Sequence, residues 1–140
     1  MKTAAFLSTA VIVGVTLVTS AAFAAAPLHH AVTIRHQTSH CHTWALDKGS
    51  YKAHIDATLA VGGSLTVTNN DVMPHRLLEL SGPRALYSQS PSLSHMGATV
   101  KVTFPRAGVY EFKTKVGEDY MKGVKTTGED NVLTMKVVVR

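Results

Sequence analysis

The sequence has very little cysteine: Cys41 is the single one among 140 residues. An intramolecular disulfide is therefore excluded, and Cys41 is left as a free thiol, a metal ligand or half of an intermolecular bridge. Acidic residues are also few, nine against fourteen Lys and Arg, which gives a formal net charge of +5. The basic residues are scattered along the chain. We therefore do not expect a nucleic-acid partner.

The motifs that mark most enzymes are missing as well. The sequence shows no nucleophile paired with a base, no Gly-rich phosphate loop and no carboxylate dyad. We therefore predict a protein that binds a ligand and does not catalyse a reaction.

One apolar run occurs at the N-terminus. Lys2 precedes it, residues 4–18 carry no charge, and the small-residue pattern Ala22-Phe23-Ala24 follows. The run is short for a membrane span and ends at a pattern typical of signal-peptide cleavage, so cleavage is favoured over a retained anchor. We expect residues 1–24 to be a signal peptide and the mature protein to be periplasmic, without membrane attachment. Cleavage removes one Lys and no acid, which changes the charge from +5 to +4.

The pattern of the remaining chain predicts β structure. Apolar and polar residues alternate in several short segments, which predict strands at 64–68, 77–80, 100–104, 109–114 and 133–139. Turns rich in Gly, Pro and Asn separate them, and residues 82–98 form a long connection with room for a short helical turn. This spacing predicts an all-β fold, an antiparallel sandwich or barrel, over residues 38–140. Residues 25–37 are expected to be a loose arm or an edge strand.

The segment Asn69 to His75 is the most informative part of the sequence. A strand ends at an Asn-Asn-Asp turn, and Met73-Pro74-His75 follows. Pro74 fixes its own φ and biases Met73 towards an extended conformation, so His75 has a rigid mount that suits a metal ligand.

Two motifs resemble the cupredoxins, the family of plastocyanin and amicyanin. The first is this strand, Asn/Asp turn and Pro74-His75, and the second is the strand Gly108-Val109-Tyr110-Glu111-Phe112-Lys113-Thr114. The resemblance covers roughly residues 38–140. It implies a Greek-key β-sandwich, a copper cofactor and His75 as the first copper ligand.

The sequence departs from the family at two ligand positions. Thr114 stands where the resemblance implies the copper thiolate, and no histidine occurs after His95. Met121 still matches the axial methionine of the family. A blue-copper centre needs two His and a thiolate, so ordinary fast electron transfer is not expected.

Other residues are candidates to complete a copper site. His40-Cys41-His42 places two histidines on one face if it is a strand. His42 and His40 are then candidate partners of His75, and Met73, Cys41 and Met121 are candidate sulfur ligands that favour Cu(I). Glu118 and Asp119 offer oxygen, which suits Cu(II). His29, His30 and His36 belong either to a flexible arm that captures metal ions or to an ordinary solvated segment, and the sequence leaves both alternatives open.

Three functions are compatible with these residues. The first is copper handling in the periplasm, meaning binding, storage, delivery or tolerance, with a copper-accepting or redox protein as partner. The second is electron transfer at an unusual copper centre, and the third is a metal-free cupredoxin-like module that binds another protein. The fold alone does not separate them.

Overall fold

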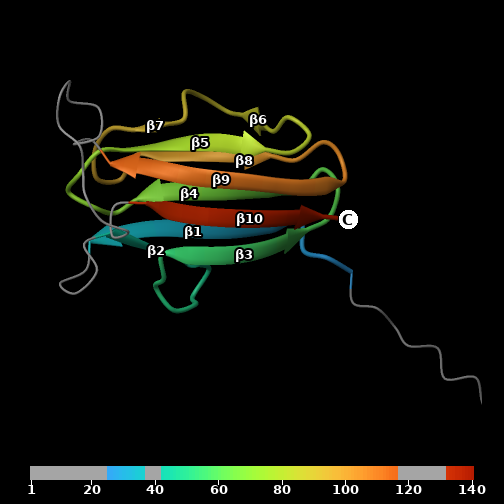
Figure 1. Cartoon of the computed structure of the whole chain (residues 1–140), viewed down its shortest axis with the longest axis horizontal. Coiled ribbons are helices and arrows are strands. Elements are labelled where there is room, and N and C mark those ends of the chain that lie inside the picture. Colours follow the sequence, from blue (N-terminus) through green and yellow to red (C-terminus); the bar gives the residue numbers. More distant parts are fainter. Residues whose placement is uncertain (1–24, 37–41, 117–131) are drawn as a thin grey trace, which may run out of the picture.

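The computed structural model describes residues 25–36, 42–116 and 132–140, which form a β-sandwich of two layers (Figure 1). Its strands are β1 (His29–His36), β2 (His42–Leu46), β3 (His54–Leu59), β4 (Ser64–Asn69), β5 (His75–Ser81), β6 (Leu86–Tyr87), β7 (Ser92–Leu93), β8 (Thr99–Thr103), β9 (Gly108–Val116) and β10 (Leu133–Val139). The described part of the chain contains no helix, and so no helix that is long and apolar enough to cross a membrane.

The strands divide into two five-stranded sheets. One has the order β2-β1-β4-β8-β6 and the other β3-β10-β9-β5-β7. Most neighbours are antiparallel, but β1 runs parallel to β4 and β3 runs parallel to β10. The predicted all-β sandwich is thus confirmed, with one parallel pair in each sheet.

The segment expected to be an arm or edge strand is instead an interior strand. β1 lies between β2 and β4 and pairs with both. Val32 and Ile34 are fully buried, so the strand contributes to the core as well as to the hydrogen-bonded ladder. His30 is also fixed, with its Nδ1 2.6 Å from Asp47 Oδ2 and its Nε2 3.1 Å from the Thr58 carbonyl. Residues 29–36 are therefore part of the folded unit and not a flexible metal-catching arm.

The core lies between the two sheets and is built by period-two alternation. In β9 the side chains of Tyr110, Phe112 and Thr114 are buried, and Phe104 packs edge-on against both aromatic rings at 4.9 and 6.0 Å. The Tyr110 hydroxyl donates a hydrogen bond to the Arg106 carbonyl at 2.8 Å, so its polar end is satisfied while its ring is buried. Tyr110 and Phe112 share one face, as the alternation predicted.

The connection at residues 82–98 has no helical turn and contains the two-residue strands β6 and β7. β7 pairs with the first two residues of β5, so that His75 lies opposite Leu93. β5 is longer than the sequence predicted, because it begins at His75 directly after Pro74. His75 is therefore anchored in a sheet, with β9 on its other side.

Candidate metal centre

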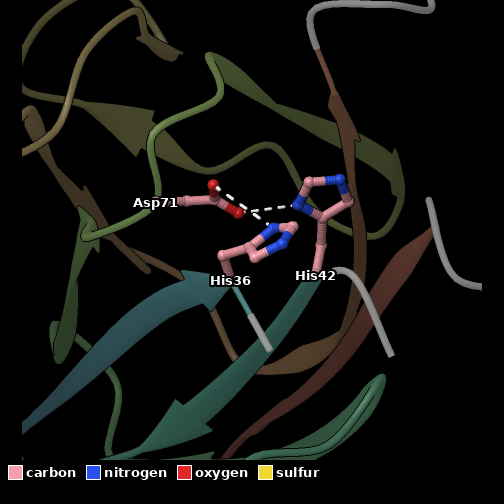
Figure 2. Close-up of side chains that lie close together, drawn as sticks. All are labelled: His36, His42 and Asp71. Carbon is pink, nitrogen blue, oxygen red and sulfur yellow. Dashed lines mark hydrogen bonds and ion pairs between the residues drawn. The ribbon is translucent and has the colours of Figure 1, made fainter. Parts of the chain in front are cut away.

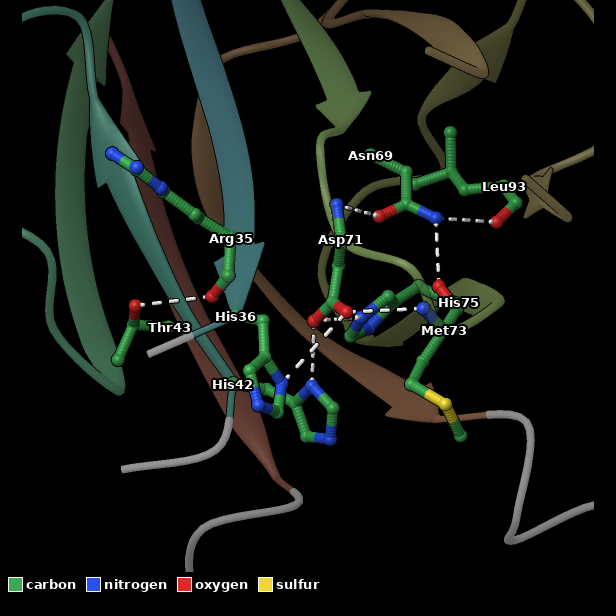
Figure 3. Close-up of polar contacts among 9 residues, drawn as sticks. All are labelled: Arg35, His36, His42, Thr43, Asn69, Asp71, Met73, His75 and Leu93. Carbon is green, nitrogen blue, oxygen red and sulfur yellow. Dashed lines mark hydrogen bonds and ion pairs between the residues drawn. The ribbon is translucent and has the colours of Figure 1, made fainter. Parts of the chain in front are cut away.

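Three histidines and one aspartate gather at one end of the sandwich, where β1 and β4 end and β2 and β5 begin (Figure 3). Figure 2 shows two of these histidines, His36 and His42, beside Asp71. His36 is the last residue of β1, His42 the first of β2 and His75 the first of β5. Asp71 lies in the turn between β4 and β5. We call His36, His42, Asp71 and His75 the histidine cluster.

Asn69 shapes the turn that carries Asp71. Its fully buried side-chain amide donates hydrogen bonds to the carbonyls of Met73 at 2.9 Å and Leu93 at 3.0 Å. Its side-chain oxygen accepts a bond from the Asp71 amide at 2.9 Å. This Asx arrangement follows directly from the Asn-Asn-Asp sequence, and it directs the Asp71 side chain into the protein.

The Asp71 carboxylate is the centre of the cluster. It is fully buried, and its Oδ2 lies 2.6 Å from His42 Nδ1 and 3.3 Å from His75 Nε2. Its Oδ1 accepts the Met73 amide at 3.0 Å. An ionised carboxylate can only accept, so each imidazole donates an N–H to it in the absence of a metal.

His36 completes the cluster from the solvent side. Its Nδ1 lies 3.9 Å from Asp71 Oδ1, and its side chain is 51% exposed. Its ring meets that of His42 edge-on at 5.5 Å, and the His42 ring meets that of His75 at 5.2 Å. Ligand atoms of His36, His42 and Asp71 all lie within 4.8 Å of one another, which is close enough to hold one metal ion.

The charge states of Asp71 and His75 suit the binding of a cation. Burial alone would raise the pKa of Asp71, but the hydrogen bonds from the Met73 amide, His42 and His75 together lower that pKa below 3.8. Burial also lowers the pKa of His75 below 6.5, against the opposing effect of the Asp71 carboxylate. At neutral pH the site therefore contains an ionised carboxylate and a neutral His75 imidazole.

Three buried polar atoms have no hydrogen-bond partner among the described residues: Trp44 Nε1, His75 Nδ1 and Thr114 Oγ1. With His75 Nε2 engaged by Asp71, its Nδ1 is a free lone pair. Thr114, which replaces the expected thiolate, lies opposite Leu77 in the β5–β9 ladder. Its hydroxyl is buried in the core and cannot take the place of a soft sulfur ligand.

The structure brings together two of the residues predicted as metal ligands, His75 and His42. Met73 takes part through its backbone amide and carbonyl, while its side chain points away from the Asp71 carboxylate (Figure 3). The predicted ligands His40, Cys41 and Met121 lie outside the described residues.

Sequence reasoning missed Asp71 and His36 as members of the cluster. The sequence indicated Asp71 only as part of a turn, because the approach of β1 and β2 that buries its carboxylate is not visible in the local sequence. His36 lies opposite His42 in the β1–β2 register. That pairing would follow from recognising both strands as a hairpin, in which directly opposed residues share a face.

No protein-family model matches the sequence, and no curated protein matches it. Solved structures with a similar fold include a purple cupredoxin from Nitrosopumilus maritimus, with 19% identity and a TM-score of 0.43 over 79% of this chain and 98% of that one. A reduced amicyanin variant shows 20% identity and a TM-score of 0.42 over 79% and 82%. A cysteine protease inhibitor from Entamoeba histolytica shows 11% identity and a TM-score of 0.44 over 81% and 99%.

Cupredoxins are thus among the structures that are similar to this chain, at TM-scores of 0.42 and 0.43. The protease inhibitor scores equally well, so the similarity assigns neither a metal nor a function. Any assignment must rest on the residues of the histidine cluster.

Proposed function

We propose that this protein binds copper in the periplasm and serves copper handling, meaning storage, delivery or tolerance. The observation that supports this function is the convergence of imidazole nitrogens of His36, His42 and His75 on the buried Asp71 carboxylate. Imidazole is the commonest metal-binding side chain and suits copper well.

The residues present fit a copper ion. A buried carboxylate with two buried imidazoles is a costly arrangement in a protein core unless each group has a partner. The nitrogen of His75 that faces Asp71 is Nε2 and not the partnerless Nδ1, and together with His42 Nδ1 it lies beside the carboxylate. Copper bound at the cluster would supply a positive charge that the carboxylate and the imidazoles stabilise together.

The position of the cluster suits exchange of copper with a partner protein. His36 is half exposed, so one candidate ligand is accessible from solvent. Val72, directly after Asp71, is 70% exposed and offers apolar surface beside the site. Export is supported by the signal-peptide pattern of residues 1–24, and N-terminal sequencing of the secreted protein tests it.

The decisive experiment is titration of the purified protein with Cu(II) and with Cu(I), in competition with chelators of known affinity. We expect one tight equivalent in the wild type and a loss of at least tenfold in affinity for His42→Ala and for His75→Ala. The control is His95→Ala, which removes an exposed histidine outside the cluster. Equal affinity in all four proteins would refute the site.

Visible spectra of the Cu(II) form separate copper handling from electron transfer. A weak ligand-field band is expected from nitrogen and oxygen ligands. An intense band that Cys41→Ser abolishes would place a thiolate on the metal, and would favour electron transfer at an unusual copper centre instead.

A metal-free interaction module is the second candidate function. One observation favours it: the Asp71 carboxylate accepts hydrogen bonds from His42, His75 and the Met73 amide, so the network is satisfied at this carboxylate without a metal. Absence of stoichiometric copper binding would favour this candidate.

A further inference from the structure

The centre of the histidine cluster is an oxygen anion and not a sulfur atom. Both oxygens of the buried Asp71 carboxylate face imidazole nitrogens, at 2.6 Å from His42, 3.3 Å from His75 and 3.9 Å from His36. The nearest thioether in the turn, that of Met73, points away from the carboxylate (Figure 3). The described residues therefore present nitrogen and oxygen donors.

The spacing of these donors suits direct coordination by Asp71. Two ligands at about 2.0–2.1 Å from one ion lie about 2.9 Å apart at the 90° angle of tetragonal Cu(II), and about 3.4 Å apart at the tetrahedral angle of Zn(II). The His36–Asp71 distance of 3.9 Å exceeds the larger spacing by about 0.5 Å, and ligand atoms of His36, His42 and Asp71 all lie within 4.8 Å of one another. His75, 3.3 Å from Asp71, lies outside that group of ligand atoms. The His42–Asp71 distance of 2.6 Å is that of a hydrogen bond, which opens when an ion replaces the shared proton.

We propose that the cluster is a divalent-metal site in which the Asp71 carboxylate and the imidazoles of His36 and His42 are direct ligands, with His75 holding the Asp71 carboxylate in place, and that it takes Cu(II) in preference to Cu(I). This inference rests on the proposed copper function and specifies it. Carboxylate and imidazole ligands suit divalent ions, whereas thiolate and thioether ligands select Cu(I). The anionic oxygen also compensates the second positive charge of the ion.

His36 has a distinct part in this site. It is the exposed member of the cluster, at the end of β1, whereas Asp71, His42 and His75 are buried. An incoming ion meets His36 first, and the buried ligands then complete its coordination. Loss of His36 should therefore weaken binding without disturbing the core.

The test measures the affinities of the purified protein for Cu(II), for Zn(II) as a redox-inert divalent probe, and for Cu(I) under anaerobic conditions. We expect the order Cu(II), Zn(II), Cu(I), in which Cu(II) exceeds Zn(II) as usual for nitrogen and oxygen sites. Asp71→Asn and His36→Ala should each lower Cu(II) and Zn(II) affinity by at least tenfold. The exposed control His95→Ala should change neither.

Two further measurements keep the result interpretable. Because Asp71 is buried, circular dichroism of metal-free Asp71→Asn checks that the variant folds. If Asp71→Asn does not fold, the test rests on His36→Ala, because His36 is half exposed and its loss should leave the core intact. Electron paramagnetic resonance of the Cu(II) protein should show hyperfine coupling to imidazole nitrogens, with one nitrogen fewer in His36→Ala.

The outcomes separate this inference from the function on which it rests. Tight Cu(I) binding that Cys41→Ser or Met121→Leu abolishes, with weak Cu(II) and Zn(II) binding, would overturn the divalent site and keep the copper function. Cu(II) binding that is unaffected by both Asp71→Asn and His36→Ala would overturn the ligand set alone. Absence of binding by all three ions would overturn both proposals.

Discussion

At the scale of single residues, His75 combines burial with a hydrogen bond to a carboxylate. Its neutral imidazole is stable inside the protein, because burial lowers its pKa more than Asp71 raises it. The unfolded chain binds a proton at about pH 6.5, before the folded protein does. Protonation of this group therefore favours unfolding.

This shift predicts that the metal-free protein becomes less stable in mild acid. The contribution of His75 to the free energy of unfolding is complete above pH 6.5 and is lost as the pH falls from 6.5 through the lower folded-state pKa. The slope in this window is up to about 1.4 kcal/mol per pH unit. Denaturant unfolding between pH 8 and pH 5 measures it. An identical slope in His75→Gln would contradict the assignment to this residue.

Asn69 gives a second residue-scale prediction. Its side chain makes three hydrogen bonds in the turn, so Asn69→Ala leaves the carbonyls of Met73 and Leu93 and the amide of Asp71 without these partners. We expect a loss of at least about 2 kcal/mol of unfolding free energy, together with weaker copper binding. Chemical denaturation measures the first effect. The neighbouring and exposed Asn70→Ala should change stability by less than about 0.5 kcal/mol.

At the scale of strands and turns, alternation predicted β4, β8, β9 and β10 because large apolar residues mark their inner faces. It missed β3, where Ala57 takes an inner position between Ile55 and Leu59 and weakens the signal. β1 was misjudged because its ends are polar histidines. Its interior position depends on pairing with β4, about thirty-five residues away in the chain.

The candidate site was predictable only in part for the same reason. Pro74 fixes His75 locally, so the Met-Pro-His sequence was enough to select it. The burial of Asp71 depends on the approach of β1 and β2 to its turn, and no local pattern contains that information. The sequence is enough to identify His75 as a candidate ligand. Which other side chains lie beside it depends on how the strands assemble into sheets.

Gly82, just after β5, supports a prediction at this scale. Its φ is +120°, and a Cβ there would lie 2.7 Å from the Val109 carbonyl oxygen and 2.9 Å from Tyr110 Cα in β9. Gly82→Ala should lower the unfolding free energy by about 3 kcal/mol or more, since backbone strain and a backbone clash add. Gly62 also has a positive φ, +80°, but a Cβ there would meet no atom within 4 Å. Gly62→Ala should therefore lose only the about 1–2 kcal/mol that backbone strain costs, without a clash. Thermal or denaturant melts would contradict this reasoning if the two variants lost equal stability.

At the scale of the whole molecule, β10 connects β3 to the rest of the second sheet. It lies between β3 and β9 and pairs with both along its length. Without it, β3 loses its partner in the sheet, β9 keeps only β5, and the buried side chains of Leu133, Met135, Val137 and Val139 leave the core.

A chain that ends after residue 131 should therefore fail to fold. We expect no cooperative thermal transition by circular dichroism and no one-equivalent copper binding. Removal of Arg140 alone, beyond the end of β10, is the control and should preserve both. A cooperative melt in the shorter chain would show that the first sheet folds independently.

The position of β10 also determines the order of folding and metal loading. All members of the histidine cluster have been synthesised once the chain reaches residue 75. The second sheet, which contains β5, is complete only after residues 133–139 have been added. If the chain does not fold before then, as predicted above, its eight histidines can capture ions in non-native combinations. We therefore expect copper that is supplied during refolding to slow the formation of the native protein, whereas copper that is added to the folded apoprotein should bind without this delay.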